Sequence, residues 1–507
     1  MEKLDLAQFI GIRFMDVKRD HFFNILLILS ICFFVIGGGS IYEYQKSYTI
    51  AELEIALSSA SRMINGILIA MIAGLSFVLT LTSQLYTPKL ALIFLTSPII
   101  MGGFLVIILA NFLIVLSPLL LSNEQLQPIV CSAAFIISFL GLSLVMPLFV
   151  HIIHFLRPDY FLPLLNYKIK RGFRKLENGY VSRKDYIRII AKWDIITNIA
   201  LTAIKRDDRQ LIRLATKMLD ESLYYLLSRS RIRNQKWRKI NAFYVPGLTQ
   251  EGCDYLKEHL CWPEAYLLYK KEQILKTVCV EQKDIVADAC TNIHKSIEIA
   301  VKGNLDQLLE LHLMFTNSLM RDSLEKKNIH LFQTFSYHYR VNCELLRTKP
   351  YHYKEVFASW SYYGRAAFNE GLEFGLETVL YDYGKLLISI CQEDKDVAFS
   401  MLREEIAPLW QEGTKLEGKP CQVSWRVIVK TYWEAKQAGY EVVAKYIQKN
   451  FLMDRKQHWL VFCELSSFNS PLSWELKDRL LSFTYLDPKI IEEASSYFSD
   501  YRKKLVG

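Results

Sequence analysis

The chain has 507 residues, 51% of them hydrophobic, and a formal net charge of +9 at pH 7. This length allows two or three domains, and the apolar residues are concentrated in residues 1–160, whereas the rest has the composition of a soluble helical protein. The ten cysteines form no CxxC pair, which argues against a disulfide framework or a zinc site. We therefore expect no metal and no cofactor.

Four stretches are long and apolar enough to cross a bilayer, which takes roughly 20 residues. They run from about Phe22 to Ile41, from about Met63 to Gln84, within Phe94 to Leu121, and from about Ile129 to Leu156. The first is long for a signal-peptide core, and no A-x-A cleavage site follows it. We expect an all-α protein with a cytosolic arm over 1–21, four transmembrane helices within 22–160, and a helical cytosolic domain over 161–507.

Basic residues beside these stretches indicate the orientation of the chain. Eleven Lys and Arg flank the side that holds the N-terminal arm and the segment after the fourth stretch, and only Lys46 and Arg62 flank the other side. Positive charge marks the cytosolic side. Both termini are therefore expected in the cytosol, with the chain as a multi-pass protein of a bacterial inner (plasma) membrane.

The second apolar stretch carries polar side chains at helical spacing. Steps of three and four residues place the following on one helical face: Arg62, Asn65, Ser76, Thr80, Ser83 and Thr87. The opposite face, which includes Leu68 and Leu75, suits lipid, and Gly66, Ala70 and Gly74 form a ridge of small residues.

Two interpretations of this polar face stay open. One is tight helix packing, with Ser and Thr bonding their own backbone. The other is a water-filled path lined by uncharged oxygens, with Arg62 at its outer mouth. No carboxylate lies inside any of the four stretches, which argues against a proton-coupled pump or a voltage sensor.

Two histidines, His151 and His154, lie one turn apart near the inner end of the fourth stretch. Such a pair can bind a metal or titrate near neutral pH. No Cys, Asp or Glu nearby completes a ligand set, so we expect two interfacial histidines instead.

The stretch SASRMINGILIAMIAGLSFVLTLTSQLYTPKL includes Ser61-Arg62, Ser76-Phe77, Gln84 and Pro88-Lys89. In these residues the chain resembles a bacterial family of predicted membrane proteins, domain of unknown function 2254, over about residues 20–160 and weakly beyond Asp194. The Ser-Phe order is reversed relative to the family, and KRDDRQLIR stands where the family has an Asn-Asp-Pro turn. The resemblance implies four membrane helices at the start of the chain, and the family has no established activity.

From Lys168 onward, periodic apolar residues predict helices almost throughout, without a convincing strand. The last helix is predicted to start with Asp487 as its N-cap and Pro488 in its first turn.

One internal similarity is visible in this part. Residues 203–212, 300–309 and 371–380 superpose without gaps. Asp207 with Gln210, and Asn304 with Gln307, are predicted to form capping boxes that open a helix. The pattern indicates stacked helical hairpins, which usually bind a partner or mediate assembly. The alternative is coincidence, because helix–turn–helix joints resemble one another.

A basic run occupies residues 228–239 around Trp237. Its charged members are Arg229, Arg231, Arg233, Lys236, Arg238 and Lys239. The run could bind anionic lipid headgroups, a phosphate-bearing ligand or nucleic acid, or it could be a solvated loop. We favour lipid, and a nucleotide ligand comes second. We expect no nucleic acid, because no recognisable binding fold accompanies the run.

Catalytic motifs are absent from the sequence: it has no HExxH, GxSxG, Walker glycine loop or dinucleotide fingerprint. His338 and His352 lie among tyrosines, which is typical of packed interfaces. We therefore expect that the protein is not an enzyme.

Together these features predict an oligomeric ion channel or pore lined by the second membrane helix and assembled or gated by the cytosolic helices. A single four-helix bundle packs its own interior, so such a pore needs several copies of the chain. The alternative is a membrane-anchored scaffold or sensor whose helical array binds a protein partner or a small ligand.

Overall fold

The computed structural model describes residues 50–85, 98–120, 157–178, 183–229, 248–278, 282–348, 352–467 and 485–499, together with Arg238 and Val245. The chain divides into two compact units, Met1–Lys168 and Ile169–Gly507. This boundary falls inside a helix and lies beyond the one expected at residue 160. The described residues form helices without a strand, which confirms the all-α prediction.

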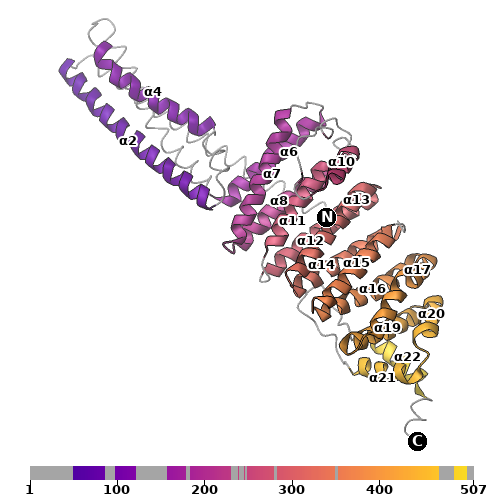
Figure 1. Cartoon of the computed structure of the whole chain (residues 1–507). Helices are drawn as coiled ribbons and strands as arrows, with labels where there is room; N and C mark the ends of the chain where they lie inside the picture. Colours follow the sequence, from indigo (N-terminus) through magenta and orange to yellow (C-terminus); the bar gives the residue numbers. More distant parts are fainter. Residues whose placement is uncertain are drawn as a thin grey trace. The chain divides into compact units, whose positions relative to one another are not determined.

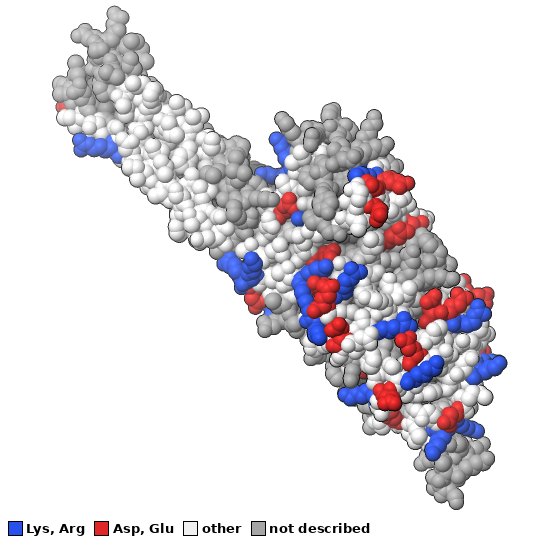
Figure 2. Space-filling model, in the orientation of Figure 1, with Lys and Arg blue, Asp and Glu red and all other residues white. Residues whose placement is uncertain are grey.

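The first unit contains two long apolar helices, α2 (Ile50–Leu85) and α4 (Pro98–Leu120), which pack against each other (Figure 1). With 36 residues, α2 is about 54 Å long at 1.5 Å per residue, well beyond the ~30 Å hydrocarbon core. Its polar first turns, which include Glu52, therefore extend the helix past the apolar segment. On the face seen in Figure 2, the described residues of these helices are mostly uncharged, apart from charged atoms near one end.

The prediction of four membrane spans is only partly met within the described residues. One helix is long and apolar enough to cross a membrane by length and composition, and that segment is Ser61–Gln84. In α4 the apolar segment is shorter, Ile100–Leu109. The first and fourth predicted spans, with His151 and His154, lie outside the described residues.

The second unit is a series of helices that begins within α6 (Pro158–Glu177). The next helices in chain order are α7 (Arg183–Ile204), α8 (Arg209–Ser228), α10 (Gln250–Glu258), α11 (Trp262–Thr277), α12 (Lys283–Lys302), α13 (Asp306–Glu325), α14 (Ile329–Glu344), the short 3-10 helix η4 (Leu345–Thr348), α15 (His352–Asn369) and α16 (Glu373–Glu393). They are followed by α17 (Lys395–Met401), the π-helical turn η5 (Leu402–Ile406), α18 (Ala407–Lys415), α19 (Lys419–Gln437), α20 (Glu441–Phe451), α21 (Arg455–Ser466) and α22 (Pro488–Tyr497).

These helices form two layers. In one layer α7 packs against α11, α11 against α13, and α13 against α15. In the other, α8 packs against α12, α12 against α14, α14 against α16, and α16 against α19. Consecutive helices such as α7 and α8, α13 and α14, and α15 and α16 also pack together as hairpins (Figure 1). The second unit is therefore an array of stacked helical hairpins, the first of the two interpretations that the sequence left open.

One backbone turn recurs at several joints between helices. A residue with positive φ lies at each of these joints: Asp207, Asn304, Lys327, Gly371 and Gly439. The N–H group of the next residue donates to the carbonyl five positions back, over 2.8 to 3.0 Å. This left-handed turn closes the end of one helix and directs the chain into the next.

Two details of the predicted repeat were wrong. The N-cap of α8 is Asp208, whose carboxylate accepts from the Leu211 N–H, whereas Asp207 occupies the left-handed position. Asn304 likewise lies in the turn, and the N-cap of α13 is Leu305, which has no side-chain cap. The predicted boxes failed because a helix end and a helix start share these residues.

The third copy was also out of register. Its left-handed residue is Gly371, so residues 367–376, and not 371–380, match the other two segments. The predicted start of the last helix is confirmed, because Asp487 accepts from the Lys489 N–H and Pro488 is the first helical residue.

Candidate functional site

The polar face of α2 is anchored to α4 through one hydrogen bond. Asn65 is half-buried, and its side-chain oxygen accepts from the Asn111 amide at 2.7 Å. Both amides lie between apolar helices, where a hydrogen bond between side chains holds two helices in register. Asn65 therefore joins the two helices, and the sequence had not identified Asn111 as its partner.

The other residues of this face bond within α2. The Ser76 hydroxyl donates to the Ile72 carbonyl at 2.8 Å, and the Thr80 hydroxyl donates to the Ser76 carbonyl at 2.9 Å. Both are exposed, as is Arg62, whereas Ser83 is half-buried. Thr87 lies outside the described residues. These bonds are the backbone contacts expected of the packing interpretation.

The face of α2 that was expected to meet lipid is partly buried in the structure. Val78 and Thr82 are buried on the side of α4, and the nearby Leu68 and Leu75 are half-buried, although this face had been expected to meet lipid. The face that carries Ser76 and Thr80 is exposed, together with Phe77 at 64%. Added Cβ atoms at the ridge glycines Gly66 and Gly74 would meet nothing within 4 Å.

The basic run is only partly described, and its two described arginines are engaged. Arg238 is 3% exposed, and its guanidinium donates to both carboxylate oxygens of Glu264 at 2.7 and 2.9 Å. The Trp262 indole N–H donates to the Arg238 carbonyl, which fixes this residue against α11. Arg238 is therefore a buried structural group and is not exposed to lipid or a phosphate ligand.

Arg229 forms an ion pair with Glu177 at 3.3 Å and lies over the Tyr225 ring, 5.1 Å from its centroid. It is still about half exposed, so its charge faces solvent on one side. The remaining candidates of the run lie outside the described residues: Arg231, Arg233, Lys236 and Lys239.

A buried ion pair joins three helices of the array. Lys271 on α11 is fully buried and donates to Asp220 on α8, which is 2% exposed. The Asn292 amide on α12 donates to the second Asp220 oxygen at 2.9 Å. Burial raises the pKa of Asp220, and the Lys271 charge opposes that rise. Because the charge is matched and hydrogen-bonded, this cluster holds helices together.

A second buried cluster lies between α14, α15 and α16. Asp382 is fully buried, accepts from the Ser336 hydroxyl at 2.7 Å, and pairs with Arg340 at 3.2 Å. The Trp360 indole N–H donates to Ser336 at 3.1 Å. Nearby, His338 is 6% exposed within the aromatic packing that the sequence indicated. The side chain of His352 is not described.

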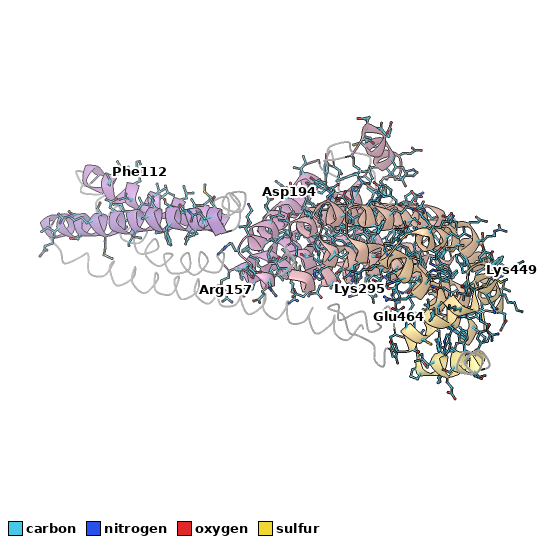
Figure 3. The ribbon with its side chains drawn as sticks, turned by 60° about the horizontal axis from the view of Figure 1, so that its bottom comes forward. Phe112, Arg157, Asp194, Lys295, Lys449 and Glu464 are labelled. Atoms are coloured by element: carbon cyan, nitrogen blue, oxygen red, sulfur yellow. The ribbon has the colours of Figure 1, made fainter. Side chains whose placement is uncertain are left out.

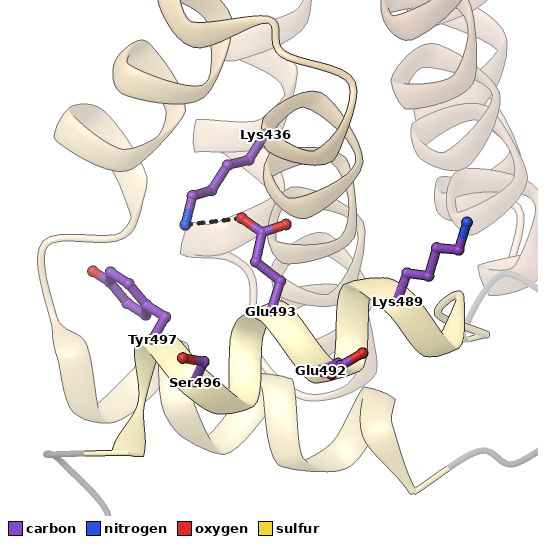
Figure 4. A pocket seen from close by; sticks show the side chains of 6 residues that line it. All are labelled: Lys436, Lys489, Glu492, Glu493, Ser496 and Tyr497. Carbon is purple, nitrogen blue, oxygen red and sulfur yellow. Dashed lines mark ion pairs between the residues drawn. The ribbon is translucent and has the colours of Figure 1, made fainter.

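A shallow pocket of about 470 Å³ lies near the C-terminal end of the described part of the chain (Figure 4). The following residues from α19 and α22 line it: Lys436, Lys489, Glu492, Glu493, Ser496 and Tyr497. Lys436 pairs with Glu493 at 3.3 Å and lies over the Trp433 ring, 4.7 Å from its centroid. The pocket lining carries both basic and acidic side chains, and two of these are paired with each other. We see no catalytic arrangement among these lining residues.

The buried thiols and two buried histidines of the array are not activated for chemistry, whereas burial lowers the pKa of Lys430 to about 8. Burial raises the pKa of the Cys261, Cys290 and Cys391 thiols to about 12, so they stay protonated. Burial lowers the pKa of His312 and His458 to about 4. No group of three or more His, Cys, Asp or Glu within the described ranges could hold a metal ion.

No family model matches the chain, and no curated protein or solved structure was found that matches it. The resemblance to the domain of unknown function 2254 therefore stays a prediction. Function has to be argued from the chain's own residues.

Proposed function

We propose that this protein is a membrane-anchored helical-repeat protein whose array binds a protein partner. The observation that carries the proposal is the regular stacking of hairpins through one recurring turn. Stacked hairpins expose an extended surface, and such surfaces commonly bind other proteins. The apolar first unit, with α2, serves as the anchor in a bacterial inner membrane, and both termini are cytosolic.

Two further features support a binding role over a catalytic one. The strongest polar clusters, around Lys271 and Asp382, are buried and matched, so they stabilise the array. The buried thiols and histidines have pKa values shifted away from neutral pH, which makes them poor nucleophiles and bases.

Photocrosslinking in cells tests this proposal. A photoreactive side chain at Met314 or Tyr362, which are 57% and 63% exposed on neighbouring helices, reports what contacts the array. We expect the same adduct from the full chain and from a chimera in which an unrelated membrane anchor replaces residues 1–156. An adduct that disappears on anchor exchange, while the chimera stays folded and membrane-bound, would place the function in the spans and refute the proposal.

A second candidate is an oligomeric pore lined by the polar face of α2. The observation that favours it is the exposure of Ser76 and Thr80 beside the open glycine ridge, although Asn65 on the same face bonds to Asn111 of α4. Several copies could bring such faces together around an axis. A pore of this kind predicts an ion current that Thr80→Leu changes, whereas an anchor predicts none.

A further inference from the structure

Helix α6 has one face built into the array. Ile169, Phe173 and Leu176 are fully buried along its second half. Gly172 lies so close to α7 that an added Cβ would be 2.9 Å from the Ile189 side chain. The Phe173 ring stacks on the Tyr225 ring of α8, with centroids 5.2 Å apart. This packing fixes the rotation of α6 about its own axis.

Polar contacts at the sides of α6 fix the same orientation. Lys170 pairs with Glu221 of α8 at 2.7 Å. Glu177 accepts from the Tyr225 hydroxyl at 3.2 Å and pairs with Arg229. The remaining face of the helix is therefore held outward, away from α7 and α8.

That outward face is strongly basic. Lys168, Arg171, Arg174 and Lys175 are exposed at helical spacing, and none of their side chains has a hydrogen bond or ion pair within the described part of the chain. Tyr167 lies between them on the same face, with 53% of its surface exposed. Other exposed lysines without an ion pair in the described part of the chain lie on separate helices, such as Lys217 on α8 and Lys295 on α12.

We propose that this face of α6, defined by Tyr167, Lys168, Arg171, Arg174 and Lys175, binds the phosphates of anionic lipids at the membrane surface. The inference rests on the proposed membrane anchoring. Three observations select this occupant: four uncompensated positive charges, an exposed tyrosine among them, and a helix that starts at Pro158, directly after the apolar stretch 129–156. Basic residues next to a span meet anionic headgroups, and tyrosine favours the headgroup level.

Hydrogen–deuterium exchange of the full chain in nanodiscs tests the inference. One set of discs holds phosphatidylcholine alone, and the other holds equal parts of phosphatidylcholine and phosphatidylglycerol. Each basic residue near anionic lipid strengthens binding about fivefold. We therefore expect amides of α6 to exchange at least about tenfold more slowly in the anionic discs. High salt should abolish the difference, because it screens exposed charges.

A matched pair of variants separates this face from net charge. Lys168→Gln/Arg171→Gln/Arg174→Gln/Lys175→Gln removes the face and keeps good helix formers, and we expect it to lose the lipid-dependent protection. The control removes the same charge from exposed lysines elsewhere and should retain the protection: Lys217→Gln/Lys295→Gln/Lys415→Gln/Lys449→Gln. Lys295 on α12 and Lys449 on α20 are labelled in Figure 3.

Three results would overturn the inference. The first is equal exchange of α6 in both kinds of disc although the chain is inserted. The second is loss of protection in the control variant as well. The third is equal protection in phosphatidylcholine discs after addition of inorganic phosphate, which would identify a free-anion site instead of a membrane surface. Failure of the chain to enter discs would instead refute the proposed anchoring, so the two failures are distinguishable.

Discussion

The buried Lys271–Asp220 pair provides the sharpest test of how the array is held together. Both side chains are at most 2% exposed, and Asn292 supplies the second hydrogen bond to the carboxylate. Lys271→Met leaves Asp220 charged, buried and without its cation. Loss of one partner of a buried pair costs about 3–5 kcal/mol, because the remaining charge is uncompensated.

Exchange of amide hydrogens in α8, α11 and α12 measures this cost locally, which suits an array whose hairpins need not unfold together. We expect exchange there to accelerate on the order of a hundredfold or more, since each tenfold corresponds to about 1.4 kcal/mol. The control Lys302→Met removes an exposed pair with Glu298, and should cost less than about 1 kcal/mol.

The double variant Lys271→Met/Asp220→Asn shows whether the loss of stability comes from the uncompensated charge or from lost packing. Asn at position 220 can still accept from Asn292, and no buried charge remains. We expect it to recover most of the lost protection. If the double variant is as unstable as Lys271→Met, the loss comes from packing of the lysine stem, and the reasoning from uncompensated charge is refuted.

Three further predictions concern the turns, a buried histidine and the helix pair. Lys327, between α13 and α14, has a φ of 52°, and Gly371, at the corresponding place between α15 and α16, has a φ of 79°. Lys327→Gly should therefore stabilise the array by about 1 kcal/mol, and Gly371→Ala should destabilise it by a similar amount. Thermal unfolding of the full chain measures both changes. Burial lowers the pKa of His458 to about 4 from 6.5. The neutral side chain therefore contributes fully to the free energy of unfolding above pH 6.5, and this contribution falls by about 3 kcal/mol as the pH drops toward 4. His458→Phe should flatten the dependence of the free energy of unfolding on pH in this range. Asn65→Leu should destabilise the α2–α4 pair by about 1 kcal/mol, and Asn65→Leu/Asn111→Leu should restore it, as measured by reversible unfolding in detergent micelles.

The sequence predicted the helical class and left the hairpin array open against coincidence, because helices follow local rules whereas stacking depends on distant contacts. Apolar periodicity marks the helices, and Asp487 with Pro488 marks a helix start. At the joints, local rules conflict. An Asp or Asn tolerates the left-handed turn as well as it caps a helix, and so Asp207 and Asn304 were assigned to the wrong position.

The candidate site was harder to predict because its partners are distant in sequence. Asn65 accepts a hydrogen bond from Asn111, which is 46 residues away in the sequence, and Arg238 donates to Glu264, which is 26 residues away. A run of basic residues resembles a solvated surface whether or not one member turns inward to a buried carboxylate. On α6, by contrast, the basic face could be found by spacing alone, but only the packing of Phe173 and Gly172 reveals that it is held outward.

We propose that the apolar helices anchor the protein and that the array performs its function. Current across a planar bilayer that contains the purified full chain tests this proposal, with wild type and Thr80→Leu compared under a salt gradient. We expect no discrete currents from either protein when insertion is verified independently. Discrete wild-type currents that Thr80→Leu alters would contradict it and establish α2 as the wall of a pore.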